Sequence, residues 1–362
     1  MTPDGNVLDR WFGKTVIKSD QRFTYQEAQH DIDNKSGEFH EELQILDNLA
    51  KVLRNKRFSE GAIDFSSEEV EFELDENGKP IDVHVKKRLD THKLVEEMML
   101  VCNREVAKKI YRLSEKEDEK HPFLYRVHGL PDREKLEDLA VFVRAMGYDF
   151  RLEEGKEVSH QDINALLNKA EGKAEEGMIN TALIRTMAKA VYSVKDEGHF
   201  GLAFEYYTHF TSPIRRYPDL VAHRLLFKHL HDKDIPEEEI QKYKKIAANA
   251  SEREREVLEA ERESIRYKQV EFMQDKVGEE FDAVISGVSE YGLYVEEEHT
   301  KAEGMVHVSN IGDDYFELDE NNYALVGQDT GKKYTLGDEV RVKLTEVNME
   351  RNELDFVFAE GE

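Results

Sequence analysis

Apolar residues recur at helical spacing through most of the first 275 residues. The clearest example follows Thr91, where Leu94, Met98, Cys102, Val106 and Ile110 form one apolar stripe on an amphipathic helix. Other apolar patterns and capping signals, such as Ser159 with Asp162, predict further helices. A short helix is expected to begin at Tyr25–Ala28. Longer helices are expected at Glu41–Arg57, at Pro131–Met146, after Ser159, at Thr181–Val194 and at Pro236–Asp275.

Alternating patterns predict strands in three places. Val7, Trp11 and Val16 predict a strand within Asn6–Ser19, directly after a turn signal at Pro3–Gly5. Alternation on both sides of Asn77-Gly78 predicts a hairpin. After Gly278, the pattern changes to short strands separated by Gly, Asn and Asp, at Phe281–Val288, Tyr291–Glu296, Gly304–Ser309, Glu339–Val347 and Leu354–Phe358.

Five such strands in a short stretch favour a small closed barrel, for which the OB-fold is a common solution. The predicted fold class is therefore α+β. A helix-rich domain at 1–275 precedes an OB-fold β-barrel at 276–360.

Composition limits the classes of protein that fit this pattern. The 362 residues include 78 acidic and 51 basic side chains, for a net charge of −27, which argues against a surface that is cationic throughout. A local basic groove remains compatible with this charge. Cys102 is the single cysteine, so no intramolecular disulfide forms. With no signal peptide pattern and no long apolar run, we expect a soluble, cytoplasmic protein without a membrane partner.

The stretch from His199 to His223 combines hydroxyls, rings and cations. Arg215 and Arg216 stand at a predicted helix start beside Thr211 and Ser212, an arrangement that suits a phosphate because guanidinium groups bind its oxygens two at a time. The alternative is structural. In that case Arg215, Arg216 and Asp219 form a buried ion network, and His209 and His223 are core histidines with satisfied hydrogen bonds.

The run His-Phe-Thr-Ser-Pro-Ile-Arg-Arg-Tyr-Pro-Asp-Leu at 209–220 resembles the signature of the ribonuclease II and ribonuclease R family of 3′-to-5′ exoribonucleases. Four further stretches are similar to the same family: Ser19–Glu27, Gly61–Phe65, Glu97–Asn103 and Tyr125–His128. The resemblance implies that 1–275 is the C-terminal part of an RNB nuclease domain. The implied reaction is hydrolysis of RNA phosphodiester bonds to nucleoside 5′-monophosphates.

The C-terminal barrel resembles the S1-type RNA-binding domain that follows the nuclease domain in this family. Tyr291-Gly-Leu-Tyr294 and Gly304–Ser309 carry the resemblance. Tyr291, Tyr294 and His307 are expected to present rings on one face, where each ring can stack on an unpaired base of single-stranded RNA. The alternative is that some of these rings pack inside the barrel, Tyr294 first among them.

The resemblance also implies roles for individual residues of the nuclease part. Arg215 matches the family's catalytic arginine, which neutralises charge on the scissile phosphate. Glu261 matches a functional glutamate near the active site. Arg216, Thr211 and Ser212 are expected to hold the RNA backbone.

The family's reaction uses Mg²⁺ held by clustered aspartates, and these lie upstream of the part that this chain matches. Asp31 with Asp33 and Asp313 with Asp314 are poor substitutes, so we expect no metal ligands in this chain and little hydrolysis by it alone. An upstream chain is a candidate partner that would supply the missing half. The alternative is a non-catalytic RNA-binding or adaptor protein.

Overall fold

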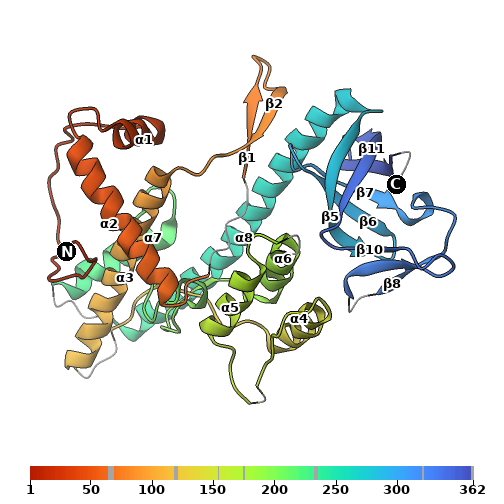
Figure 1. Cartoon of the computed structure of the whole chain (residues 1–362). Helices are drawn as coiled ribbons and strands as arrows, with labels where there is room; N and C mark the ends of the chain where they lie inside the picture. Colours follow the sequence, from red (N-terminus) through yellow and green to blue (C-terminus); the bar gives the residue numbers. More distant parts are fainter. Residues whose placement is uncertain are drawn as a thin grey trace.

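The computed structural model describes residues 1–63, 69–117, 121–153, 155–173, 176–231, 235–319 and 322–359. It contains a helical part and a β-barrel, and Figure 1 shows the long helix α8 (Glu237–Met273) running from one to the other. The α+β class and the closed barrel predicted from the sequence are both confirmed. Asp64 and Phe65, in one of the stretches that resemble the ribonuclease family, lie outside the described residues.

The N-terminal segment contradicts the predicted strand at Asn6–Ser19. The turn at Pro3–Gly5 is present, but residues 6–19 form no regular secondary structure. Val16 and Ile17 are almost fully exposed. Phe12 instead packs against the cluster between α3 (Asp90–Glu117) and α7 (Tyr217–His229). An apolar pattern alone does not make a strand, because a strand needs a neighbouring strand for its backbone hydrogen bonds. Within the described chain, residues 6–19 pair with none.

Two helices and a hairpin follow. The helix α1 (Tyr25–Asn34) begins with a capping box in which Thr24 and Glu27 bond each other's backbone N–H groups. The next helix, α2 (His40–Ser59), packs on α3 (Asp90–Glu117), and the strands β1 (Val70–Leu74) and β2 (Pro80–Val85) form the predicted hairpin. In Figure 1 the hairpin projects beyond α2 and α3, and β2 contacts the long helix α8.

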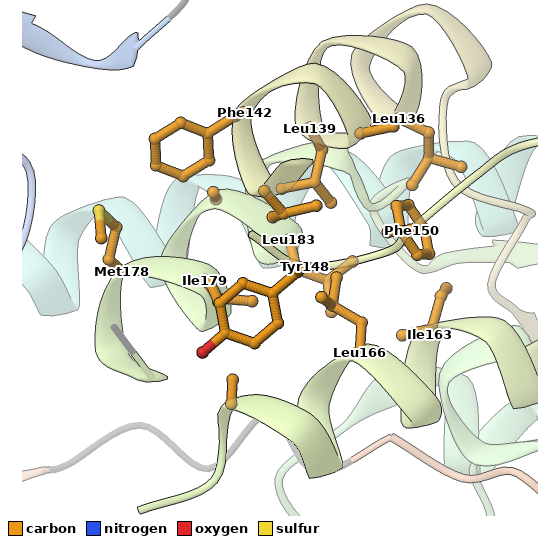
Figure 2. Close-up of a cluster of buried hydrophobic side chains, with 14 of the residues drawn as sticks. Leu136, Leu139, Phe142, Tyr148, Phe150, Ile163, Leu166, Met178, Ile179 and Leu183 are labelled. Carbon is orange, nitrogen blue, oxygen red and sulfur yellow. The ribbon is translucent and has the colours of Figure 1, made fainter. Parts of the chain in front are cut away.

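A second group of helices surrounds a core cluster of its own. These helices are α4 (Arg133–Ala145), α5 (His160–Ala170), which has the predicted Ser159–Asp162 capping box, and α6 (Glu176–Thr186). Figure 2 shows Leu139, Phe142, Tyr148, Ile163 and Leu183 converging from these elements. Each helix contributes a few buried side chains, so the three pack as one unit.

The helix predicted for Thr181–Val194 is half wrong. The helix α6 ends at Thr186, and Val191–Ser193 forms the strand β4, which pairs antiparallel with β3 (Tyr125–Val127). The apolar residues of this stretch fit a helix and a strand equally well. Val191–Ser193 forms a strand because β3, which is distant in sequence, pairs with it.

The helices α7 (Tyr217–His229) and α8 (Glu237–Met273) complete the helical part. They share a core with α3, β3 and β4, in which Ile110, Phe123 and Leu225 are fully buried. At its far end, α8 places Val270 and Met273 in the core of the barrel. Short 3-10 helices at Phe200–Leu202, Gln274–Lys276 and Val308–Asn310 link the larger elements.

The barrel closes in the strand order β11-β12-β7-β6-β5. Its strands are β5 (Glu280–Ser289), β6 (Gly292–Glu297), β7 (Glu303–His307), β11 (Glu339–Asn348) and β12 (Glu353–Phe358), which match the five predicted segments. A small sheet of β8 (Phe316–Asp319), β9 (Ala324–Gly327) and β10 (Lys333–Thr335) was not predicted. Its strands of three or four residues are too short to show an alternating pattern. None of the helices in the described part of the chain has the length and apolar character needed to cross a bilayer.

Candidate functional site

Arg215 and Arg216 line a groove of about 640 Å³ in the helical part. Lys86 and Arg88, which follow the hairpin, and His92 on α3 line it as well, as do Tyr25 and Tyr207. Burial, together with the positive charges of Lys86 and Arg88, lowers the pKa of His92. Glu69 and Glu96 line the groove too and form ion pairs with Lys86 and Arg88, so two of its cations are already balanced by carboxylates.

The start of α7 holds Arg216 in place through a buried carboxylate. Asp219 is fully buried, and its Oδ1 accepts hydrogen bonds from the Ser212 backbone N–H at 2.8 Å and from Arg216 Nη2 at 2.9 Å. The Arg216 N–H also donates to the Ser212 carbonyl, and Pro218 lies in the first turn of the helix, where its missing N–H costs nothing. The sequence Ser-Pro-Ile-Arg-Arg therefore folds as a tight loop around the Asp219 side chain.

Arg215 differs from its neighbour. Its side chain is exposed, and it forms no hydrogen bond or ion pair with any other residue that the structure describes. The buried ion network expected as the structural alternative therefore includes Arg216 and Asp219 but not Arg215. A cation at a groove without a carboxylate partner is available to an anionic ligand.

Several buried polar atoms in this loop lack a partner among the described residues. They are Thr211 Oγ1, Arg216 Nε and Asp219 Oδ2. A buried polar atom without a hydrogen bond costs free energy, and such atoms concentrate where a ligand or water completes the site. Thr211 and Arg216, both expected to contact the backbone of RNA, thus keep unused hydrogen-bonding capacity. Ser212 contributes its backbone N–H to the loop.

The histidines of the motif have satisfied partners. His223 Nε2 lies 2.8 Å from the Phe210 carbonyl oxygen, and its ring stacks on Phe210. His209 Nδ1 lies 2.9 Å from the Tyr192 hydroxyl, and burial with the nearby charges of Arg216 and Arg126 lowers the His209 pKa to about 2. The structural alternative therefore describes these two side chains well, and His209 is neutral at physiological pH.

Glu261 is not placed at the groove. It lies on α8 with its side chain exposed, it does not line the groove, and no hydrogen bond or ion pair joins it to Arg215 among the described residues. Its role stays a prediction.

The three barrel rings lie on the outer surface. Tyr291 and Tyr294 are 62% and 36% exposed, and His307 is exposed opposite Gly292 in the β6–β7 pair. The alternative that placed Tyr294 inside the barrel is wrong, because the neighbours Leu293 and Val295 point inward and the side chains of a strand alternate. The Tyr294 ring lies over Gly287 instead, where any larger residue would crowd it.

Sequence reasoning missed several residues of the groove. Lys86, Arg88 and His92 come from a segment far from the motif in sequence. The run Lys86-Lys87-Arg88, unusual in an acidic chain, was the available signal. A buried ion pair, Arg57 Nη2 to Glu97 Oε1 at 2.5 Å, was also missed, and it fixes α2 to α3.

The carboxylates considered as metal ligands do other work. Asp314 accepts hydrogen bonds from Thr330 and from the Asp329 N–H, which lower its pKa to about 2. Asp33 accepts from Gln29 on the same helix. Across the described residues, no group of three or more His, Cys, Asp or Glu side chains could hold a metal ion. The residues described do not fit a two-metal centre, which requires clustered carboxylates.

The fold and the groove together define a two-part protein, with a helical domain that presents arginines at a helix start and an OB-type barrel that presents aromatic rings. Comparison with known proteins identifies the parts. The RNB domain profile matches residues 1–232, and the S1 RNA binding domain profile matches residues 274–357. The chain belongs to the RNB family.

Its relatives are ribonucleases R. The chain is 37% identical over 363 residues to ribonuclease R of Aquifex aeolicus, covering 98% of this chain and 50% of the relative. It is 32% identical to the Escherichia coli enzyme, with 99% and 45% covered. Mycoplasma genitalium RNase R, solved with ribose-methylated single-stranded RNA, superposes with a TM-score of 0.85 at 28% identity and covers 93% of this chain and 53% of that one. The chain thus spans about half the length of the curated relatives it matches.

Proposed function

We propose that this chain binds single-stranded RNA as part of a 3′-to-5′ exoribonuclease of the ribonuclease R type, and that it acts in the cytoplasm. The observation that carries the proposal is the exposed Arg215 side chain, which has no carboxylate partner among the described residues, at a groove that Arg216 also lines. Phosphates of one RNA strand would bind there, while unpaired bases stack on Tyr291, Tyr294 and His307 of the barrel. RNA-bound and RNA-free forms of the Mycoplasma enzyme, both similar in fold to this chain, support RNA as the ligand.

The reaction proposed for the assembled enzyme is hydrolysis at the RNA 3′ end. Water adds to phosphorus, the bond to the 3′ oxygen of the preceding nucleotide breaks, and a nucleoside 5′-monophosphate leaves. Arg215 would neutralise the negative charge that gathers on the phosphate oxygens. Magnesium, when bound, would activate the water; because the described residues do not fit a magnesium site, its ligands would come from elsewhere, such as an upstream chain.

The affinity of the chain for single-stranded RNA tests this proposal. Fluorescence anisotropy with a labelled single strand should show binding that weakens as salt rises, because bound phosphates release counterions. Arg215→Ala should weaken binding about tenfold, roughly 1.4 kcal/mol. Arg253→Ala, an exposed arginine on α8, is the matched control and should leave affinity unchanged. Equal affinity of Arg215→Ala and the unsubstituted chain would reject the proposal.

A non-catalytic RNA-binding or adaptor role is the second candidate, favoured by the lack of a carboxylate cluster among the described residues. Incubation of the labelled strand with the chain and Mg²⁺ distinguishes the two. RNA binding without degradation, even when the remaining half of a relative is added, favours the adaptor. Degradation that Arg215→Ala abolishes favours the nuclease.

A further inference from the structure

A second groove lies on the barrel side of the molecule, where the turn before β6 meets the small sheet β8–β10. It has a volume of about 1010 Å³. The turn contributes Glu290 and Tyr291 to its lining. Tyr315 just before β8, Glu317 on β8 and Gln328 just after β9 line it as well. None of these residues except Tyr291 was among the predicted RNA contacts.

The register of the small sheet determines which side chains face this groove. Glu317 pairs with Val326, which pairs with Lys333, so these three side chains lie on one face of the sheet. Tyr315 shares this face because it lies two residues from Glu317, and Phe316 between them is buried in the barrel core. The outer face of the small sheet therefore carries the Tyr315 ring, the carboxylates of Glu317 and Asp319, and the Lys333 ammonium group beyond Val326. Asp319 accepts a hydrogen bond from the Asn322 side chain.

The position of Tyr315 is fixed by its neighbours. Its carbonyl accepts the Gln328 N–H at 2.9 Å, and Asp314 beside it accepts from the backbone N–H groups of Asp329 and Thr330. The Tyr315 ring is nevertheless 67% exposed. A ring held by an ordered backbone but left in water is suited to stack on a ligand, because little conformational entropy is lost on binding.

This groove continues the barrel face on which Tyr294 and His307 lie. Tyr291 lines the groove, and its carbonyl accepts the Val308 N–H directly after His307. A single strand that stacks on the rings of the barrel face would therefore reach Tyr315 next. The occupant to which these observations point is an unpaired nucleobase.

The polar groups of the groove are selective for one edge of a base. Glu317 forms no hydrogen bond or ion pair with any other described residue, and a carboxylate only accepts hydrogen bonds. The amino groups of cytosine and adenine donate, whereas uracil presents a carbonyl oxygen at the corresponding position. The carboxylate can therefore accept from the amino group of cytosine or adenine, as it could from that of guanine, whereas at this position uracil offers only an oxygen and its nearest donor is the ring N3–H.

We propose, on the basis of the RNA-binding function above, that Tyr315 and Glu317 form a further base subsite that selects bases with an exocyclic amino group. Tyr315 stacks on the base, Glu317 accepts from its amino group, and Lys333 lies on the same face to meet a phosphate. The clearest comparison is cytosine with uracil, since these pyrimidines differ at the position that carries the amino group.

Binding of labelled oligo(C) and oligo(U), each about ten nucleotides long to span the barrel, tests the proposal by anisotropy with the full chain. We expect about fivefold tighter binding of oligo(C), which Glu317→Gln should reduce to near equality. Glu350→Gln, an exposed glutamate in the turn between β11 and β12, should keep the difference. Tyr315→Ala should weaken both oligonucleotides about fivefold or more, whereas Tyr267→Ala, an exposed tyrosine on α8, should not.

Equal binding of oligo(C) and oligo(U) by the unsubstituted chain, or a difference that survives Glu317→Gln, would overturn the subsite. If Arg215→Ala still weakened both oligonucleotides in that case, the proposed RNA-binding function would stand and only the subsite would fall. If the chain bound neither oligonucleotide, both would fall together.

Discussion

The groove beside α7 and the outer face of the barrel are both proposed to contact RNA, but the residues that support them differ. In the groove, Arg216 is held by the fully buried Asp219, with polar atoms nearby that lack partners. On the barrel, Tyr294 lies on a strand whose inward neighbours Leu293 and Val295 are fully buried apolar residues. Changes to the groove's support should therefore cost stability as well as binding, whereas loss of a ring on the barrel should cost binding alone.

The largest effect is expected from Asp219→Ala. Removing this carboxylate leaves the Arg216 guanidinium and the Ser212 N–H without their acceptor, and breaking a buried pair in this way costs about 3–5 kcal/mol. Urea unfolding followed by circular dichroism measures the loss. Glu252→Ala, an exposed acid on α8, is the control and should change little. A loss under about 1 kcal/mol for Asp219→Ala would show that the groove does not depend on buried charge.

The next effect is a dependence of stability on pH that arises in the helical part. Burial, with nearby positive charges, lowers the pKa of His209 to about 2 and that of His199 to about 3, against an ordinary 6.5. Below pH 6.5 both histidines become protonated in the unfolded chain but stay neutral in the folded chain. The free energy of unfolding should therefore decrease as the pH is lowered below 6.5, by about 1.4 kcal/mol per pH unit for each histidine.

Asp196 opposes this trend. Burial raises its pKa from 3.8 to about 6, so in that range the folded chain binds the extra proton and gains stability as pH falls. Urea unfolding between about pH 6.5 and 4.5 should therefore show a shallower slope for His209→Gln and a steeper one for Asp196→Asn. Gln26→Ala, at an exposed side chain on α1 that does not titrate, should leave the slope unchanged. An unaltered slope for His209→Gln would mean that this imidazole titrates normally in the folded chain.

On the barrel, Tyr294→Ala should weaken binding of single-stranded RNA by about 1–3 kcal/mol, the usual contribution of one stacked ring. The free energy of unfolding should stay nearly the same, because the ring lies outside the apolar core. Anisotropy and urea unfolding of the same preparation test both parts, with Tyr267→Ala as the matched control. A large loss of stability without a loss of affinity would reverse the contrast between the two regions.

The same contrast explains what the sequence could and could not predict. Capping boxes at Thr24 and Ser159, the hairpin at Asn77-Gly78 and the barrel strands were predictable because their signals lie within a few residues. The strand at Val191–Ser193 and the unpaired segment at 6–19 were not, since the presence or absence of a distant partner decides them. Local pattern therefore predicts elements whose signals are local in both parts, and it misses short strands in both, such as β4 in the helical part and β8–β10 beside the barrel.

The candidate site divides in the same way. Arg215, Arg216, Tyr291 and Tyr294 were named from two short motifs. The other cations of the groove, Lys86 and Arg88, follow the hairpin, whose strand β2 contacts α8, and no local pattern predicts that contact. The pair between Arg216 and Asp219 was expected only as the structural alternative to a phosphate site, because the sequence alone does not show that Asp219 is buried.

The smallest effect is expected from an ion pair on the barrel surface, and it provides the baseline for the first prediction. Arg341 Nη1 lies 2.6 Å from Asp282 Oδ1, shorter than the bond from Arg216 to Asp219, but both side chains are largely exposed. Water and salt screen such a pair, so Asp282→Asn should cost about 0–1 kcal/mol and less at high salt. Urea unfolding at low and high salt measures this cost. If Asp282→Asn lowered the free energy of unfolding as much as Asp219→Ala, burial would not explain the contribution of an ion pair in this protein. The distance between the charged atoms would then be the better explanation.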